Sequence, residues 1–472
     1  MRIRIFLGEC GCAAIALLVL MSGTDSALGQ GAAAAPASAA TSSTEEGRTP
    51  LSKTFDFDEW RLEERRQAFK DTKFEFNLRT MFLDRNQFTG LENEAWAIGG
   101  WAGVKTGYFL DHIAFGATYY FSVPIYAPES RDGTLLLEKG QENYDILGEL
   151  YADIRIIDGL NLNIGRKAYD TPFINRNDTR MTPNTFEAIV LQGVIELDKS
   201  DPGVNADGTA LSKEGKNVVA PPPKKEVATL KYGLGYFDQI KERNSDDFVS
   251  MARDAGADVE RGVFSGGLIY QKGKFSIGAI DYYSDDIINI AYAETKGEIP
   301  FSPDFRPKYH VQFADERSVG DNLLDGVSFR SDEIGLKAEL PVKNALFSFA
   351  FTHTWGDASL RAPWSGHPGY TSVQVQDFNR PGESAFLFRI GYEFPWVKGL
   401  SAYALGVWGT EPDQSGQYRQ DEYDFNLQWA APKKSVVDGL SVRLRFAIVD
   451  QHGGNVEDLT DFRATVNYLI KF

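Results

Sequence analysis

Between residues 72 and 472 the chain alternates hydrophobic and polar side chains with a period of two. From Val442 to Ile448, for example, every second residue is hydrophobic, and Arg443 and Arg445 stand between them. Similar stretches begin at Lys73, Ile146, Phe386 and Tyr423. This period is typical of β-strands with one apolar and one polar face. The apolar face is rich in aromatic residues and the polar face carries long charged groups. That combination is expected of a barrel with lipid outside and water inside.

The connections between these stretches alternate in length, which predicts a membrane barrel with short turns at one end and long loops at the other. Short turns are expected at sites such as 158–159 and 272–274. Long polar loops are expected at 123–142, 168–184, 238–261 and 356–381. The strand count is sixteen if 285–326 is one loop, and eighteen if 287–294 and 308–317 are strands. We prefer eighteen because it preserves the alternation. The predicted fold class is therefore an all-β, transmembrane, antiparallel barrel, wide enough for a water-filled channel.

The N-terminus predicts export. Arg2 and Arg4 precede an apolar stretch at 13–21, and small residues follow near residue 29. This is the build of a cleaved secretory signal, so we expect a signal peptide over 1–29. Residues 30–71 are interpreted as a periplasmic linker with one short helix over 55–70, and residues 72–472 as the barrel. The stretch 196–225 falls where a short turn is expected, and we interpret it as a periplasmic insertion.

The last strand carries a possible assembly signal. Tyr468, Ile470 and Phe472 share one parity, and the chain ends on Phe472 itself. This ending resembles the terminal strand of bacterial outer-membrane proteins, which their assembly machinery reads.

Composition excludes several other classes of protein. The 472 residues carry a formal net charge of −17, which disfavours nucleic-acid binding because phosphate binding needs clustered positive charge. After the first thirty residues there is no apolar run of a dozen, so a bundle of membrane helices is excluded. The 5 histidines show no H-E-x-x-H motif or other metal-ligand spacing. No catalytic residue, metal site or cofactor is predicted, and both cysteines (Cys10 and Cys12) lie in the signal.

Two segments resemble a known family. The stretches 83–109 and 165–193 resemble the OprD family of outer-membrane porins. The second has the D-x-R-x-x-P-x-T-F-E core of that family, which here begins at Asp178 and Arg180 and ends at Phe186 and Glu187. The chain departs from the family in having Ala188 where glycine is usual, and in the 196–225 insertion.

The resemblance implies an 18-stranded barrel whose third extracellular loop folds inward, and a row of basic side chains that guides carboxylate-bearing solutes. The alternation supplies lumen-facing candidates for this basic row. They are Arg79, Arg155, Lys231, Arg389, Arg443, Arg445 and Arg463. Candidates for the constriction loop and its entrance are Arg166, Lys167, Arg176, Asp178 and Arg180.

These observations predict a passive, substrate-selective porin for small hydrophilic molecules, in the outer membrane of a Gram-negative cell. Its expected partners are outer-membrane lipid, the barrel assembly machinery and small solutes, and both monomer and homo-oligomer remain open. One alternative is a general diffusion or polymer-export barrel. An alternative of another class is a secreted soluble β-sandwich that binds or hydrolyses carbohydrate.

Overall fold

The structure is a computed structural model that describes residues 57–197, 226–303, 305–454 and 456–472. The expected signal peptide (1–29), the first part of the linker and residues 198–225 of the insertion lie outside the described residues. The short helix expected over 55–70 is present as α2 (Phe57–Lys70). No helix among the described residues is both long and apolar enough to cross a membrane.

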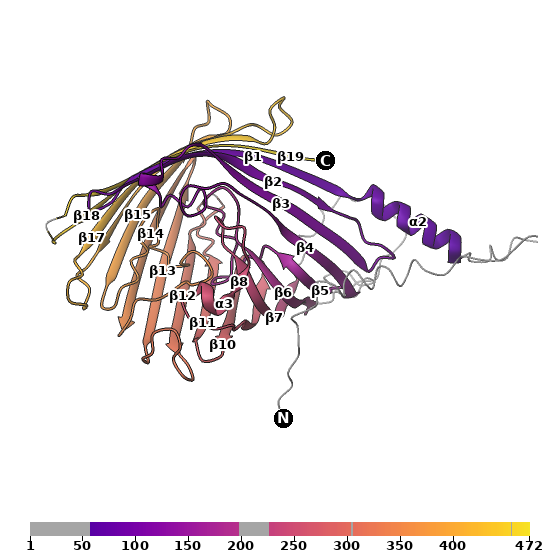
Figure 1. Cartoon of the computed structure of the whole chain (residues 1–472), viewed down its shortest axis with the longest axis horizontal. Helices are drawn as coiled ribbons and strands as arrows, with labels where there is room; N and C mark the ends of the chain where they lie inside the picture. The colour runs from indigo at the N-terminus through magenta and orange to yellow at the C-terminus, as the bar shows by residue number, and fades with distance from the viewer. Residues whose placement is uncertain (1–56, 198–225, 304, 455) are drawn as a thin grey trace, which may run out of the picture. The chain divides into compact units, whose positions relative to one another are not determined.

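A single antiparallel sheet follows α2 (Figure 1). Its first half contains β1 (Lys73–Asn86), β2 (Glu92–Lys105), β3 (Ile113–Tyr126), β4 (Tyr144–Ile157), β5 (Leu160–Lys167), β6 (Thr185–Glu196), β7 (Ala228–Lys241), β8 (Val249–Ser250), β9 (Val263–Lys272) and β10 (Phe275–Ser284). Its second half contains β11 (Ile288–Glu298), β12 (Lys308–Ser318), β13 (Arg330–Val342), β14 (Ala345–Gly356), β15 (Ser384–Glu393), β16 (Leu400–Gly409), β17 (Gln420–Ala430), β18 (Leu440–Gln451) and β19 (Leu459–Lys471). Two short helices, η1 (Glu129–Arg131) and α3 (Met251–Asp254), lie in loops.

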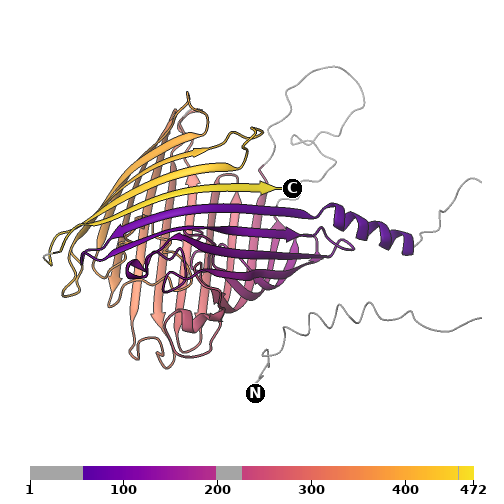
Figure 2. The ribbon, with the colours of Figure 1, turned by 45° about the horizontal axis from the view of Figure 1, so that its top comes forward.

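The sheet closes into a barrel because β19 pairs with β1, from Glu75 opposite Lys471 to Asn86 opposite Thr460. Figure 2 shows the two strands side by side. Of the 19 strands in the sheet, β8 has only 2 residues and lies within a loop, which leaves eighteen barrel strands. The prediction of eighteen strands is confirmed, since β11 and β12 occupy the stretch that the sixteen-strand count assigned to a loop. A closed ring also excludes the two-sheet sandwich.

Connection lengths follow the predicted alternation. The strands β4 and β5 are joined by Asp158 and Gly159, and β9 and β10 by Gly273 and Lys274. Gly159 and Gly273 have φ of 79° and 58°, which glycine adopts without steric cost and which suits tight hairpins. We call the end of the barrel that carries these short connections the turn end; the beginning of β1 and the end of β19 also lie there. The opposite, loop end carries L3 (168–184), L4 (242–262) and L7 (357–383).

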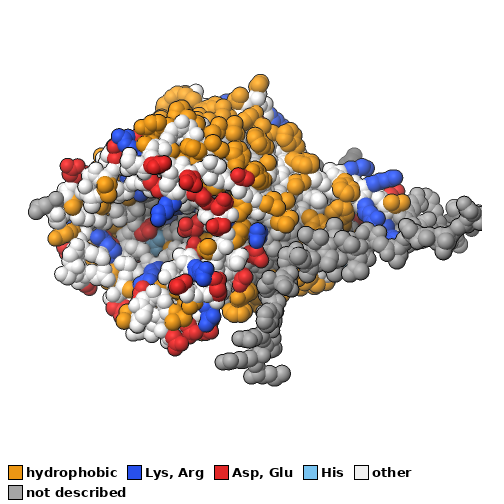
Figure 3. Space-filling view, in the orientation of Figure 1, with side chains coloured by type: hydrophobic (Ala, Val, Ile, Leu, Met, Phe, Trp, Pro, Cys, Tyr) orange, Lys and Arg blue, Asp and Glu red, His pale blue; other side chains and the backbone are white. Residues whose placement is uncertain are grey.

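The two faces of the barrel differ as the alternation predicts. Leu234 and Leu268 are 64% and 55% exposed on the outer face, whereas Arg79 and Asn77 on the inner face of β1 are buried. Figure 3 shows hydrophobic side chains gathered over the strands on one side of the molecule and charged side chains concentrated over the loops. Such an apolar outer band is what a barrel in lipid requires.

The loop-end halves of β9 to β11 depart from the alternation because they carry apolar side chains on the inner face as well. Their inner side chains pack in one buried cluster with Phe173 and Ile174 of L3, Met251 of L4, and Leu360 and Trp364 of L7. The inner members from the strands are Val263, Tyr282, Ile288, Ile290 and Tyr292. Loop side chains therefore cover this part of the inner wall and exclude water from it.

The difference between the faces can be tested on neighbouring residues of β9. Leu268→Arg places a charge on the lipid side near the middle of the strand, and we expect it to destabilise the barrel by about 2–4 kcal/mol. Ile269→Arg should cost much less, because Ile269 is on the opposite face, paired with Lys231 of β7. Chemical unfolding in liposomes, followed by heat-modifiable gel migration, measures both values. Equal losses of stability in the two variants would contradict the assignment of Leu268 to the lipid side and Ile269 to the interior.

Candidate channel site

Five of the seven predicted basic residues lie on one continuous part of the inner wall, from β15 through β19 to β1. Arg445 of β18 is directly opposite Arg463 of β19, and Arg79 of β1 is opposite Asn467 of β19. Arg389 lies on β15 and Arg443 two residues before Arg445. The alternation therefore found a real cluster, which strand pairing brings together from positions far apart in the chain.

Two of these five arginines are neutralised by carboxylates. Arg79 forms an ion pair with Asp178 of L3 at 2.6 Å and donates a second hydrogen bond to the Arg180 carbonyl. Arg463 forms an ion pair with Asp461 of its own strand, also at 2.6 Å. Arg85 of β1 binds the same Asp461 carboxylate. These side chains are largely buried, so the pairs fix L3 and the barrel seam rather than facing open water.

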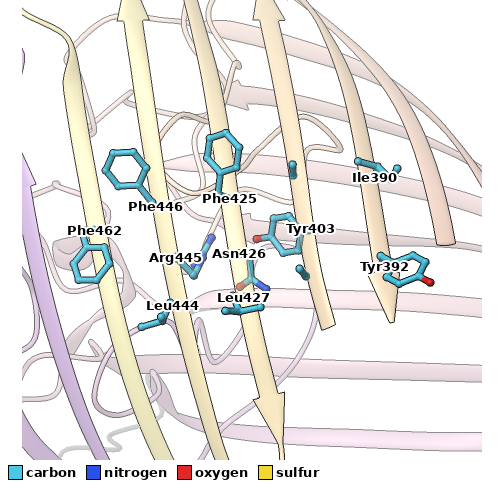
Figure 4. Close-up of a pocket in the computed structure, with 12 residues that line it drawn as sticks. Ile390, Tyr392, Tyr403, Phe425, Asn426, Leu427, Leu444, Arg445, Phe446 and Phe462 are labelled. Atoms are coloured by element: carbon cyan, nitrogen blue, oxygen red, sulfur yellow. The ribbon is translucent and has the colours of Figure 1, made fainter. Parts of the chain in front are cut away.

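The other three arginines have no carboxylate of the described residues within 4.0 Å. Arg389 lies over the Tyr403 ring at 4.0 Å, and Arg443 donates to Asn426 at 2.6 Å. The Nε of Arg445 is buried without a hydrogen-bond partner. Figure 4 shows Arg445, Asn426 and Tyr403 on the neighbouring strands β18, β17 and β16. These three arginines therefore form no ion pair among the described residues, while Asp424 on the neighbouring strand β17 is close enough to Arg445 to interact with its charge.

The two remaining candidates of the basic row lie elsewhere. Arg155 is near the turn end of β4, with its guanidinium 4.2 Å from the Tyr108 ring. Lys231 is near the turn end of β7, opposite Val194 and Ile269. Neither belongs to the wall formed by β15 to β1.

The constriction candidates also divide into groups. Asp178 and Arg180 lie where L3 reaches β1, and the buried Arg180 donates to the Thr134 carbonyl at 2.8 Å. Arg176 forms an ion pair with Asp170 within L3 at 2.7 Å, and this hydrogen-bonded contact raises the pKa of Arg176. Lys167 donates to Asn163 at 2.8 Å.

Arg166 lies on the outer face. It shares the parity of the exposed Ile164, pairs with Glu187 at 2.9 Å and lies over the Phe248 ring. The expectation that it stands at the entrance of the constriction therefore does not fit the register of β5. The order Leu162, Ile164, Arg166 already carried this signal in the sequence.

The alternation did not identify the role of L7. Its backbone amides at Val375 and Gln376 donate to the two carboxyl oxygens of Glu422 at 2.8 and 2.7 Å. The backbone amide of Gln374 donates to the Asp424 carboxyl at 3.2 Å. Both acids lie on the inner face of β17 and are buried. We call residues 374–376 with these two acids the L7 latch.

The latch extends to β19. The Gln374 side chain donates to Asp461 at 2.7 Å, and Arg463 donates to the Gln374 carbonyl at 3.0 Å. Glu422 and Asp424 therefore accept hydrogen bonds from L7, and Asp461 accepts them from L7, Arg463 and Arg85. The alternation within 420–430 is consistent with Glu422 and Asp424 facing the interior. Nothing in the sequence identifies residues 374–376 as their hydrogen-bond partners.

The other part of L7 is anchored to β11, β13 and β14. Tyr370 donates to Glu294 at 3.0 Å, and the Thr371 and Thr352 hydroxyls are 2.5 Å apart. The His367 ring lies 3.2 Å from Glu333. Burial by itself lowers the pKa of His367, but the charge and hydrogen bond of Glu333 outweigh burial, so the pKa is raised.

Comparison with known proteins identifies the family. The sequence profile described as outer membrane porin, OprD family, matches residues 223–472. The chain belongs to the OprD family. As an OprD porin it is a substrate-specific channel of the outer membrane, with its apolar face against lipid. The resemblance read from 83–109 and 165–193 is thereby confirmed at the level of the family.

Solved structures of porins share the fold. OpdK of Pseudomonas aeruginosa, crystallised with vanillate, is 19% identical with a TM-score of 0.69, covering 86% of this chain and 100% of that chain. A BenF-like porin of Pseudomonas fluorescens Pf-5 is 15% identical with a TM-score of 0.71, over 86% and 100% of the two chains. OccAB3 of Acinetobacter baumannii is 17% identical with a TM-score of 0.70, over 85% and 100%. A search of curated proteins found no match.

Among the described residues of this OprD porin, no group of three or more His, Cys, Asp or Glu side chains is arranged to hold a metal ion.

The latch can be tested with Glu422→Gln. In the variant one of the two carboxyl oxygens becomes an NH2 donor, so the backbone N–H of Val375 or Gln376 that faces it loses its acceptor. We expect a loss of about 1–3 kcal/mol of local stability, and amide hydrogen exchange at 374–376 faster by roughly five- to 150-fold. The matched control is Asp421→Asn on the same strand, which removes an ion pair with Arg419 and leaves L7 untouched. Unchanged exchange in Glu422→Gln would contradict the latch.

The His367 anchor predicts a pH dependence. Because the folded-state pKa is raised above its usual value of 6.5, the anchor contributes fully below that value and is lost as the pH rises through the raised pKa. Exchange protection around His367, corrected for intrinsic rates, should be higher at about pH 5.5 than at about pH 8.5. His367→Gln should remove this difference. A pH-independent protection factor in the unaltered protein would rule the effect out.

Proposed function

We propose that this OprD porin selects small carboxylate-bearing molecules, and that Arg389, Arg443 and Arg445 guide them. The observation that carries the proposal is the absence of a carboxylate partner for these three arginines in the part of the chain that the structure describes. A fixed positive charge beside a narrow aqueous path lowers the barrier for an anion.

The arginines are suited to carboxylates by their geometry as well as their charge. A guanidinium offers parallel N–H donors that match the two oxygens of a carboxylate. The ring of Tyr403 and the amide of Asn426 hold the planes of Arg389 and Arg443 without consuming their charge.

We propose that L3 narrows the channel. The contacts that support this are the ion pair of Asp178 with Arg79 on the inner face of β1, and the packing of Phe173 against Tyr282 of β10. These contacts are on strands at separate places in the ring. Arg176 and Asp170, which are about half exposed, form the charged part of L3 that a solute meets. Arg180 and Lys167 have a structural role in this proposal, because Arg180 donates to the Thr134 carbonyl and Lys167 donates to Asn163.

Relatives support the substrate class. OpdK was crystallised with vanillate, an aromatic carboxylate. Arg155 and Lys231 fit a role at the turn end, where a solute leaves toward the periplasm. The competing interpretation is a general diffusion or polymer-export barrel, which needs no unpaired arginines. We assign no catalytic activity and no cofactor to the protein.

The C-terminal residues are proposed as the assembly signal. Tyr468 and Ile470 are on the outer parity of β19, and Phe472 is 76% exposed while its backbone pairs with Phe74 of β1. An aromatic terminus that completes the seam is suited to recognition by the assembly machinery before closure. Cleavage after residue 29 would deliver the chain to that machinery.

Selectivity measurements test the guidance role. Replacing Arg389, Arg443 or Arg445 singly by Gln should lower the anion-over-cation permeability ratio by about fivefold, since one charge at 4 Å in water is worth about 1 kcal/mol. Arg166→Gln on the outer face is the control and should change nothing. Reversal potentials in planar bilayers and liposome swelling with carboxylates, neutral sugars and amines provide the readout. Unaltered selectivity in all three variants would overturn the proposal.

A further inference from the structure

The helix α2 is attached to the turn end of the barrel. The Gly107 amide, in the turn between β2 and β3, donates to the Ala68 carbonyl at 2.9 Å, and Ala68 is 1% exposed. A Cβ at Gly107 would lie within 3.0 Å of Ala68 and Asp71, so the close approach depends on glycine. The last turns of α2 are therefore held in a defined position.

An aromatic row connects α2 to the lipid-facing surface. The Phe69 and Phe109 rings are 5.4 Å apart, and the Phe109 and Phe115 rings 6.1 Å. Phe115 is 40% exposed on the outer face of β3. Phe69 itself is 68% exposed. The row thus runs without interruption from a surface that contacts lipid onto the helix.

The exposed stripe of α2 combines apolar and basic groups. Leu62, which is 52% exposed, and Phe69 are seven residues apart, so they lie on one side of the helix. Arg65 and Arg66 flank this line on either side and are exposed, as is Lys70 in the last turn. Figures 1 and 2 show α2 extending beyond the turn end of β1, outside the ring of strands. Figure 3 shows blue Lys and Arg side chains gathered in the region of α2.

We infer that α2 lies in the head-group layer of the inner leaflet of the outer membrane. Leu62 and Phe69 enter the lipid, and Arg65, Arg66 and Lys70 bind anionic phospholipid head groups. Two observations favour lipid as the occupant of this face: its continuity with the lipid-facing wall through Phe109 and Phe115, and its basic flanks. Basic residues on the rim of an apolar helix face are attracted to anionic lipid surfaces. The inference rests on the membrane location of the barrel and not on its selectivity.

Site-specific labelling tests the inference. Cys10 and Cys12 are the only cysteines of the chain, so with both replaced by Ser an introduced cysteine is unique. An environment-sensitive dye is attached at Leu62→Cys or, as the matched control, at Gln67→Cys, which is about 140° away around the helix. The protein is placed in liposomes of phosphatidylethanolamine and phosphatidylglycerol that contain a spin-labelled quencher lipid. We expect quenching at least threefold stronger at position 62 than at position 67. Equal quenching would overturn the inference.

A second variant separates lipid binding from other occupants. Arg65→Glu together with Arg66→Glu, or liposomes of neutral phosphatidylcholine, should reduce the quenching at position 62 to the level at position 67. The Arg65→Glu, Arg66→Glu variant should keep the heat-modifiable gel migration and the anion selectivity of the unaltered protein. A wrong assignment of α2 to lipid can therefore be distinguished from a wrong assignment of the channel's selectivity. Quenching that persists in both conditions contradicts the role of the basic flanks. A disulfide between two Leu62→Cys chains, with no lipid quenching, would assign the face to a second copy instead.

Discussion

The pairing of β1 with β19 is the constraint on which the rest of the structure depends. In lipid there is no water to bind an exposed backbone N–H or C=O, so a sheet is stable only when it has no edge. The register from Glu75 opposite Lys471 to Asn86 opposite Thr460 satisfies both edges along their length. Once this ring is closed, each strand has one face in lipid and one in the interior, and the alternation of side chains follows from that geometry.

Closure with eighteen strands creates an interior too wide for wall side chains to fill. Loop segments occupy much of it, and the buried cluster around Tyr282, Ile290 and Trp364 shows how: apolar residues of L3, L4 and L7 cover an inner wall that is itself apolar. These side chains obtain hydrophobic stabilisation inside a barrel whose centre would otherwise hold water. The inner wall from β15 to β1 is polar and charged instead.

On that wall, L7 holds the acidic side chains by hydrogen bonds. Glu422, Asp424 and Asp461 accept from amides of L7, and the single carboxylate of Asp461 also forms ion pairs with Arg463 and Arg85. A carboxyl whose oxygens already accept from backbone donors has fewer lone pairs left for a direct hydrogen bond from a guanidinium, although its charge still acts over a distance. L7 thus binds the acids that lie beside Arg445 and Arg463, and among the described residues it forms no ion pair or hydrogen bond with Arg443 or Arg445 themselves.

The sequence alone predicted the strands and the family and favoured eighteen strands over sixteen, because a period of two and a motif such as the Asp178–Glu187 block are local properties of the chain. It also placed Arg443, Arg445 and Arg463 on the inner face, since parity within a strand fixes the side. Only the tertiary structure decided which of these arginines is neutralised. The partner of Arg79 is 99 residues away, and that of Gln374 on β19 is 87 residues away. Such pairs depend on strand register around the ring and on the path of L3 and L7 across it, and no local periodicity encodes either.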